Sequence, residues 1–133
     1  DGFAFLDKIS FDAFNESTVL EKNIFLHKER FGKLPEVVIT DNIYGTRENR
    51  RMLSEKKVKA SLMPLGRRQK EKAGDIKWIK KKQRERNRIE GIIGNGKNNY
   101  GLGRILYKIA GGEEILVRLG LSAMNLSTAL ARI

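Results

Sequence analysis

Apolar and polar positions alternate along the first part of the chain in a way that predicts a strand followed by a helix. The apolar stretch over 3–11 predicts the strand. Leu20, Ile24 and Phe31 then fall on one stripe at helical spacing, and Gly32 is a typical residue to end such a helix. The chain therefore begins with a strand that leads into an amphipathic helix.

Two more strands are predicted on either side of a second helix. The β-branched run at 36–40 is short and apolar, which is typical of a buried strand, and Asp41 stands at its carboxyl end. Thr46 predicts the N-cap of a helix that continues to about Ser54, and 58–62 predicts the next strand. This order of strands and helices favours an α/β fold with parallel strands, in which functional residues lie at the carboxyl ends of strands.

The second half of the chain is predicted to be helical. We expect a single domain over 1–133 that consists of an α/β core at 1–65, a basic linker at 66–75 and a helical part at 76–133. The helical part should contain one long basic helix over 76–93 and further helices over 105–133, broken at Gly111 and Gly112. Five side chains of the last stretch share one helix face and are expected to cover the core: Ile115, Leu119, Ser122, Leu126 and Leu130.

Charge changes this picture more than any other part of the composition. The net charge is +11, and residues 67–108 hold 14 Lys and Arg against 4 Asp and Glu. A solvated helix laced with ion pairs is the usual explanation of such a run, but here the imbalance is too large for pairing to neutralise. Binding to a polyanion by counterion release explains it better, so nucleic acid is the favoured partner.

The rest of the composition excludes several classes of protein. The chain has no cysteine, which removes disulfides and cysteine zinc sites and fits a reducing cytoplasm. No apolar run approaches the length of a membrane span, so no membrane association is expected. An apolar fraction of 40% is ordinary for a folded domain.

Two acidic residues are the candidates for chemistry. Asp41 at the end of a strand could hold a metal ion, although capping of the next turn is the commoner role at such a position. Glu90 shares a helix face with Arg86 and Lys97 over about 16 Å of axis. That face is either a row of ion pairs, which is the commoner case, or a metal ligand beside phosphate-binding cations.

Several segments resemble bacterial insertion-sequence DDE transposases. Residues 37–49 resemble the segment around the second catalytic aspartate of that family. Residues 86–104 resemble the segment around its third acid, where Arg, Glu and Lys recur at fixed spacing. The stretch 2–17 is similar to one subgroup of these elements, and 124–126 is similar to the closing helix. The resemblance covers almost the whole chain.

The resemblance implies a ribonuclease H-like, three-layer α/β catalytic core. It also implies that carboxylates hold two divalent ions, Mg²⁺ or Mn²⁺, which activate an oxygen for attack on a phosphodiester. Asp41 and Glu90 would be the second and third carboxylates, both catalytic and metal-binding, while Arg86 and Lys97 would grip phosphates. The side chains expected to contact DNA are Arg84, Arg86, Arg88, Lys97 and Arg104.

The sequence departs from the family pattern at two places. Gln83 stands where the family usually has a tyrosine. The first catalytic aspartate belongs to a strand before Asp1, so we expect a core that is incomplete at its N-terminus and a fragment that is inactive alone.

The expected function is that of a transposase that cuts and joins DNA at the ends of an insertion sequence, in the bacterial cytoplasm at the nucleoid. Element ends and target DNA would be its partners, and a homo-oligomer is allowed. Two alternatives stay open: a non-catalytic basic module that binds DNA or RNA, and an interaction fragment whose basic helix meets an acidic protein.

Overall fold

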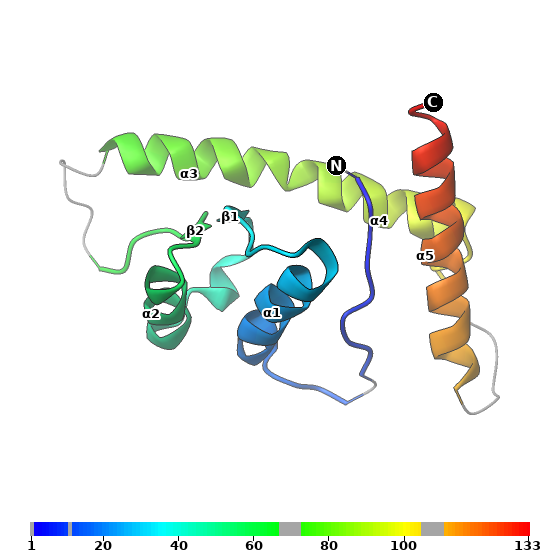
Figure 1. The fold of residues 1–133 in the computed structure, drawn as a ribbon, viewed down its shortest axis with the longest axis horizontal. Coiled ribbons are helices and arrows are strands. Elements are labelled where there is room, and N and C mark those ends of the chain that lie inside the picture. Colours follow the sequence, from blue (N-terminus) through cyan, green and yellow to red (C-terminus); the bar gives the residue numbers. More distant parts are fainter. Residues whose placement is uncertain (1, 11, 67–72, 105–110) are drawn as a thin grey trace. The chain divides into compact units, whose positions relative to one another are not determined.

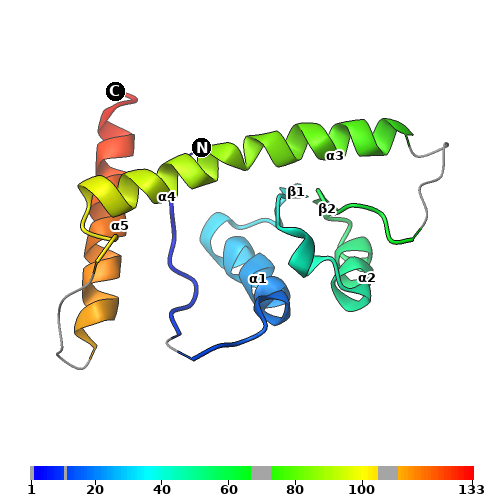
Figure 2. The ribbon, with the colours of Figure 1, turned by 180° about the vertical axis from the view of Figure 1, so that it is seen from behind.

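The computed structural model describes residues 2–10, 12–66, 73–104 and 111–133. The chain divides into two compact units, which are described separately below. One unit is Asp12–Arg86, and the other combines Asp1–Phe11 with Asn87–Ile133. Figure 1 labels their helices and strands, and Figure 2 shows the same ribbon from behind.

The unit Asp12–Arg86 holds a small parallel sheet with helices around it. Its elements in chain order are the 3₁₀ turn η1 (Glu16–Val19), α1 (Leu20–Phe31), β1 (Val37–Val38), the 3₁₀ turn η2 (Asn42–Tyr44), α2 (Arg47–Glu55), β2 (Lys59–Ala60) and α3 (Ala73–Glu85). β1 and β2 pair in parallel, with Val37 opposite Lys59 and Val38 opposite Ala60. The strands predicted over 36–40 and 58–62 are confirmed in position and in parallel direction, but each is only two residues long, and β1 is half-buried where a buried strand was expected.

Local sequence rules explain where α1 and α2 begin and end. Gly32 adopts the left-handed conformation at φ 73°, and its N–H bonds to the carbonyl of Lys28, so α1 ends there as predicted. The Thr46 side chain accepts a hydrogen bond of 3.2 Å from the Asn49 N–H, which confirms Thr46 as the cap of α2. Of the three residues on the predicted stripe, Leu20 and Ile24 are buried, whereas Phe31 is 52% exposed.

The core of this unit gathers apolar side chains from both helices and from the region of β2. Its buried members are Leu20, Ile24, Leu53, Val58 and Leu62. The parallel sheet therefore rests on α1 and α2, and the carboxyl ends of its strands are fixed relative to both helices.

The second unit is formed by α4 (Asn87–Asn99), α5 (Gly112–Leu130) and the extended segment 2–10. The strand predicted over 3–11 is wrong for the described residues 2–10, which have no regular secondary structure; Phe11 lies outside the described residues. The Ala4 N–H donates to Asn125 Oδ1 at 2.9 Å, and the Ala4 carbonyl accepts from Asn125 Nδ2 at 2.7 Å. The Asn125 side-chain amide thus makes both hydrogen bonds that the Ala4 backbone would make to a neighbouring strand.

The long helix predicted over 76–93 is wrong, because α3 ends at Glu85 and α4 begins at Asn87. At the break the Arg86 N–H bonds to the Gln83 carbonyl at 3.2 Å, an i,i+3 bond. The nine residues 80–88 are all polar, so the apolar period that suggested one helix cannot be followed across them. Of the predicted linker 66–75, residues 67–72 lie outside the described residues, and so do 105–110 of the predicted C-terminal helices.

Glycines decide how α4 and α5 pack. A Cβ at Gly120 would lie 2.7 Å from both Leu102 Cδ2 and the Tyr100 carbonyl oxygen, and one at Gly96 would lie 2.9 Å from Leu102 Cδ1. The Leu102 side chain therefore packs directly against the backbone of α4 at Gly96 and of α5 at Gly120, beside the buried Met124. The face of α5 that packs is this glycine face, so α5 starts at Gly112 as predicted but buries a different side.

The apolar row of α5 that we expected to cover the core is exposed instead. Ile115, Leu119, Leu126 and Leu130 are 60%, 61%, 66% and 70% exposed. The sequence pattern missed this because glycine has no side chain to mark a packing face. In the described part of the chain, no helix combines the length and the apolar character that crossing a membrane requires.

Candidate functional site

Asp41 lies three residues beyond β1, at its carboxyl end, and both carboxylate oxygens have partners. Oδ1 accepts a hydrogen bond of 2.6 Å from the Asn42 N–H and so caps the turn η2. Oδ2 lies 3.4 Å from a guanidinium nitrogen of Arg86. The capping role considered for Asp41 is therefore present, and it is combined with an ion pair between two of the predicted site residues.

Gln83 connects α3 to the ends of both strands. Its Nε2 donates to the Thr40 carbonyl at 3.0 Å, to the Ser61 carbonyl at 2.7 Å and to Ser61 Oγ at 3.0 Å. Ser61 is fully buried, so its two acceptors have little access to water, and Thr40 is half-buried. Because Arg86 follows Gln83 by three residues, the same contacts place Arg86 near Asp41. The sequence marked Gln83 only as a departure from the family pattern and missed this role.

The loop that follows Asp41 is held by two further side chains. Arg50 donates from Nε to the Gly45 carbonyl at 3.0 Å and from a terminal nitrogen to the Met63 carbonyl. Burial lowers the pKa of Arg50 from its ordinary value. The Tyr44 hydroxyl donates to Glu16 at 3.4 Å, and burial together with the Glu16 carboxylate raises the Tyr44 pKa. The turn after Asp41 is thus tied to segments before and after the sheet.

Glu90 lies in the other unit, on α4, and is exposed. Lys97 follows it by seven residues on the same helix, so these two share a face as predicted. Arg86 does not belong to that helix, because it stands between α3 and α4. Arg88, Lys97 and Arg104 are all exposed in the same unit as Glu90.

The described residues contain no group of three or more acidic or histidine side chains that could hold a metal ion. Asp41 and Glu90 lie in separate units, and both Asp41 oxygens already have partners. These side chains alone therefore do not provide the donor set that two hard divalent cations need.

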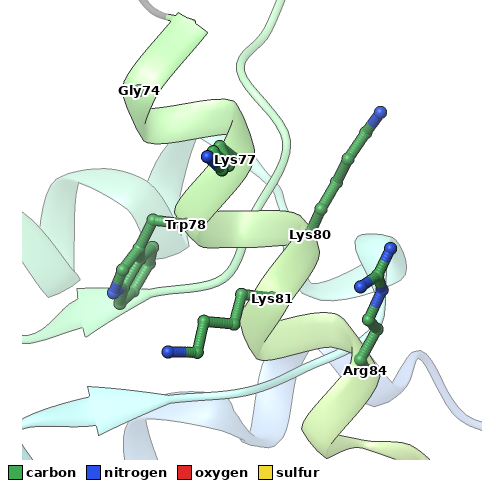
Figure 3. A pocket seen from close by; sticks show the side chains of 6 residues that line it. All are labelled: Gly74, Lys77, Trp78, Lys80, Lys81 and Arg84. Atoms are coloured by element: carbon green, nitrogen blue, oxygen red, sulfur yellow. The ribbon is translucent and has the colours of Figure 1, made fainter.

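The outer face of α3 forms a basic surface. A hollow of about 580 Å³ is lined by Gly74, Lys77, Trp78, Lys80, Lys81 and Arg84. In Figure 3, Trp78 and Lys81 extend to one side of the helix, Lys80 and Arg84 extend to the other, and Lys77 lies between them. Four cations and one indole meet there without an acidic side chain among the lining residues. The opposite face of α3 carries the buried Ile79 and the half-buried Gln83. Such a surface suits phosphates and stacked bases.

The sequence predicted only one member of this basic surface, Arg84. The three lysines were counted in the basic segment but were not assigned to a common face. Their positions at 77, 80 and 81, with Arg84 three or four residues further on, follow the helical period. That spacing was the signal that could have identified them.

Comparison with known proteins places these observations in a family. The model of the family described as "Transposase DDE domain" matches residues 38–127, which are 90 of the 133 residues and include both Asp41 and Glu90. Searches of curated proteins and of solved structures returned no match. The chain belongs to the transposase DDE domain family.

Proposed function

We propose that this protein is a DNA transposase that cleaves and joins phosphodiesters at the ends of a bacterial insertion sequence, using Mg²⁺ or Mn²⁺. The observation that carries the proposal is the family match over residues 38–127, because it spans both candidate acids and the basic segment between them. A ribonuclease H-like core is part of the proposal, and the parallel pairing of β1 with β2 supports it.

Asp41 and Glu90 are proposed as the catalytic carboxylates that bind the metal ions. Both are exposed acids inside the matched segment, so solvent and a ligand can reach them. Oxygen ligands of this kind suit Mg²⁺ and Mn²⁺. Arg86 is proposed to exchange its contact with Asp41 for a phosphate, since a guanidinium binds either anion.

Cations in each unit are proposed to contact DNA. The basic surface of α3 would contact phosphates through its lysines and Arg84, and Trp78 would stack on a base exposed by strand opening. Arg88, Lys97 and Arg104 are the proposed contacts of the second unit. Contacts with phosphate give affinity without sequence preference, so these residues should not determine which ends are recognised.

A plasmid cleavage assay on the protein at its full encoded length tests this function. We expect nicking of supercoiled DNA in Mg²⁺ or Mn²⁺ and none in a chelator. Asp41→Ala and Glu90→Ala should each lower the rate by at least about a hundredfold, because each removes a proposed metal ligand.

Glu55→Ala is the matched control, since Glu55 is an exposed acid that pairs with Arg51, four residues earlier on the same helix, at 2.9 Å. That variant should cleave at the unmodified rate. Full cleavage by both Asp41→Ala and Glu90→Ala would show that the active site is elsewhere, and metal-independent cleavage would exclude the proposed chemistry.

A further inference from the structure

Asn49, in the first turn of α2, holds two backbone carbonyls that are far apart in the sequence. Its side-chain nitrogen donates to the Ser17 carbonyl at 2.9 Å and to the Tyr44 carbonyl at 3.0 Å. The two protons of one amide thus have acceptors in η1 and in η2. Ser17 is buried, so its carbonyl has little access to water if this donor is lost.

The backbone of Tyr44 connects Asn49 to Asp41. The Tyr44 carbonyl accepts from Asn49, and the Tyr44 N–H donates to the Asp41 carbonyl at 3.2 Å. The same turn includes Asn42, whose N–H donates to Asp41 Oδ1 at 2.6 Å. Asn49 therefore restrains the turn that holds both the backbone and the carboxylate of Asp41.

Arg50, the next residue of α2, holds the next carbonyl of this turn. Its Nε donates to the Gly45 carbonyl at 3.0 Å, and a terminal nitrogen donates to the Met63 carbonyl beyond β2. A Cβ at Gly45 would lie 3.0 Å from a guanidinium nitrogen of Arg50, so the missing side chain allows this close approach. Consecutive side chains of α2 thus hold consecutive carbonyls after Asp41.

The side chain of Asn49 has no part in capping α2. The cap uses the Asn49 backbone N–H, which donates to Thr46 Oγ1 at 3.2 Å. Any residue at position 49 other than proline supplies that N–H. A substitution of Asn49 therefore removes the bonds to the two turns and leaves the start of the helix in place.

We propose that Asn49 is a positioning residue for the carboxylate of Asp41. This inference rests on the proposed function, in which Asp41 binds a divalent cation. A metal ligand works only if it is held to within about 0.5 Å of its position by groups that do not themselves touch the metal. Gln83 holds the carbonyl of Thr40 before Asp41, and Asn49 holds the turn after it.

Hydrogen exchange followed by mass spectrometry tests the restraint without reference to activity. In Asn49→Asp, a carboxylate of the same size cannot donate to either carbonyl. Amides in peptides that span 41–46 should exchange at least about tenfold faster, and those in the middle of α1 should not change. Equal exchange over 41–46 would overturn the positioning role, and so would equally faster exchange in α1, which would mean general destabilisation.

The dependence of plasmid cleavage on Mn²⁺ concentration tests the consequence for the metal, with the protein at its full encoded length. In Asn49→Ala, the Mn²⁺ concentration for half-maximal cleavage should rise by about tenfold or more, while the rate at saturating Mn²⁺ stays within about threefold of the unmodified rate. A purely structural role would lower the rate at every Mn²⁺ concentration and leave the midpoint unchanged, which would overturn the proposal.

Glu48→Gln is the matched control, because Glu48 is the exposed neighbour of Asn49 on α2. It should leave both the exchange over 41–46 and the Mn²⁺ midpoint unchanged, and an equal shift in this variant would overturn a specific role of Asn49. The two proposals can fail separately. An unmodified chain that cleaves at no metal concentration would refute the proposed function, whereas an unmodified Mn²⁺ midpoint in Asn49→Ala would refute the positioning role alone.

Discussion

Replacing Gln83 by alanine should destabilise the unit that contains Asp41 far more than an ordinary substitution at a half-buried position of a polar helix. The Gln83 amide satisfies the Thr40 carbonyl and both acceptors of Ser61. The variant leaves these acceptors without their donor, and Ser61 is fully buried. It also removes the link between α3 and the strand ends, which places Arg86 beside Asp41.

The size of the effect can be estimated from these contacts. A buried acceptor that loses its partner costs about 1–3 kcal/mol, and three acceptors that share the two protons of one amide do not add independently. We therefore expect a loss of about 2–3 kcal/mol in the free energy of unfolding. This is a large share of the stability of a small domain, which is about 5–15 kcal/mol.

Urea unfolding followed by tryptophan fluorescence measures this loss of stability in the unit Asp12–Arg86. Trp78 is the single tryptophan of the chain and lies on α3, so its emission reports the unfolding of this unit. The midpoint should fall by about 1 M or more at an unchanged slope. Lys80→Ala is the control on the exposed face of α3 and should stay within about 0.5 kcal/mol. Equal midpoints for the two variants would refute the role assigned to Gln83.

Three further predictions concern DNA binding, packing and pH. Glutamine at all four cations of the α3 surface should reduce the slope of log affinity against log salt by about 3–4, and an unchanged slope would show that DNA does not contact this face. The variant carries Lys77→Gln, Lys80→Gln, Lys81→Gln and Arg84→Gln. Gly120→Ala should lower the free energy of unfolding by about 1–3 kcal/mol, measured by thermal unfolding followed by circular dichroism, because its Cβ would clash with Leu102. Gly91→Ala should be neutral or stabilising, because a Cβ at Gly91 would have no atom within 4 Å. The raised pKa of Tyr44 means that the folded state favours the protonated phenol. The stability that the protonated phenol contributes is therefore present below pH 10.0 and is lost as the pH rises through the folded pKa. In Tyr44→Phe, the urea midpoint should fall less at alkaline pH than in the unmodified chain.

The sequence predicted the elements that depend on neighbouring residues. Thr46 and Gly32 terminate helices by local hydrogen bonding and local backbone conformation, so their roles can be recognised without knowledge of the fold. The two short strands were recognised because their β-branched residues stand between loop signals. Their parallel pairing followed from the helix between them.

The predictions that failed depended on contacts distant in the sequence. The segment 2–10 has the composition of a strand, but the Asn125 side chain, 121 positions from Ala4, takes its hydrogen bonds. The packed face of α5 is set by Gly120, which fits Leu102, and a pattern of side-chain hydropathy cannot register an absent side chain. Gln83 was missed for a similar reason, because its partners Thr40 and Ser61 are 43 and 22 positions away.

Asp41 is connected to the sheet through Gln83 and Arg86, and these two side chains make contacts of very different strength. Gln83 donates hydrogen bonds to both strand ends, and these bonds are costly to break. Arg86 forms an ion pair with Asp41, and the two side chains are 34% and 55% exposed. An ion pair with that exposure contributes only about 0–1 kcal/mol, so Arg86 can leave Asp41 for another anion without unfolding the unit. Anchoring through a buried amide and exchange at an exposed ion pair give Asp41 a fixed position together with an accessible carboxylate, as the proposed catalytic role requires.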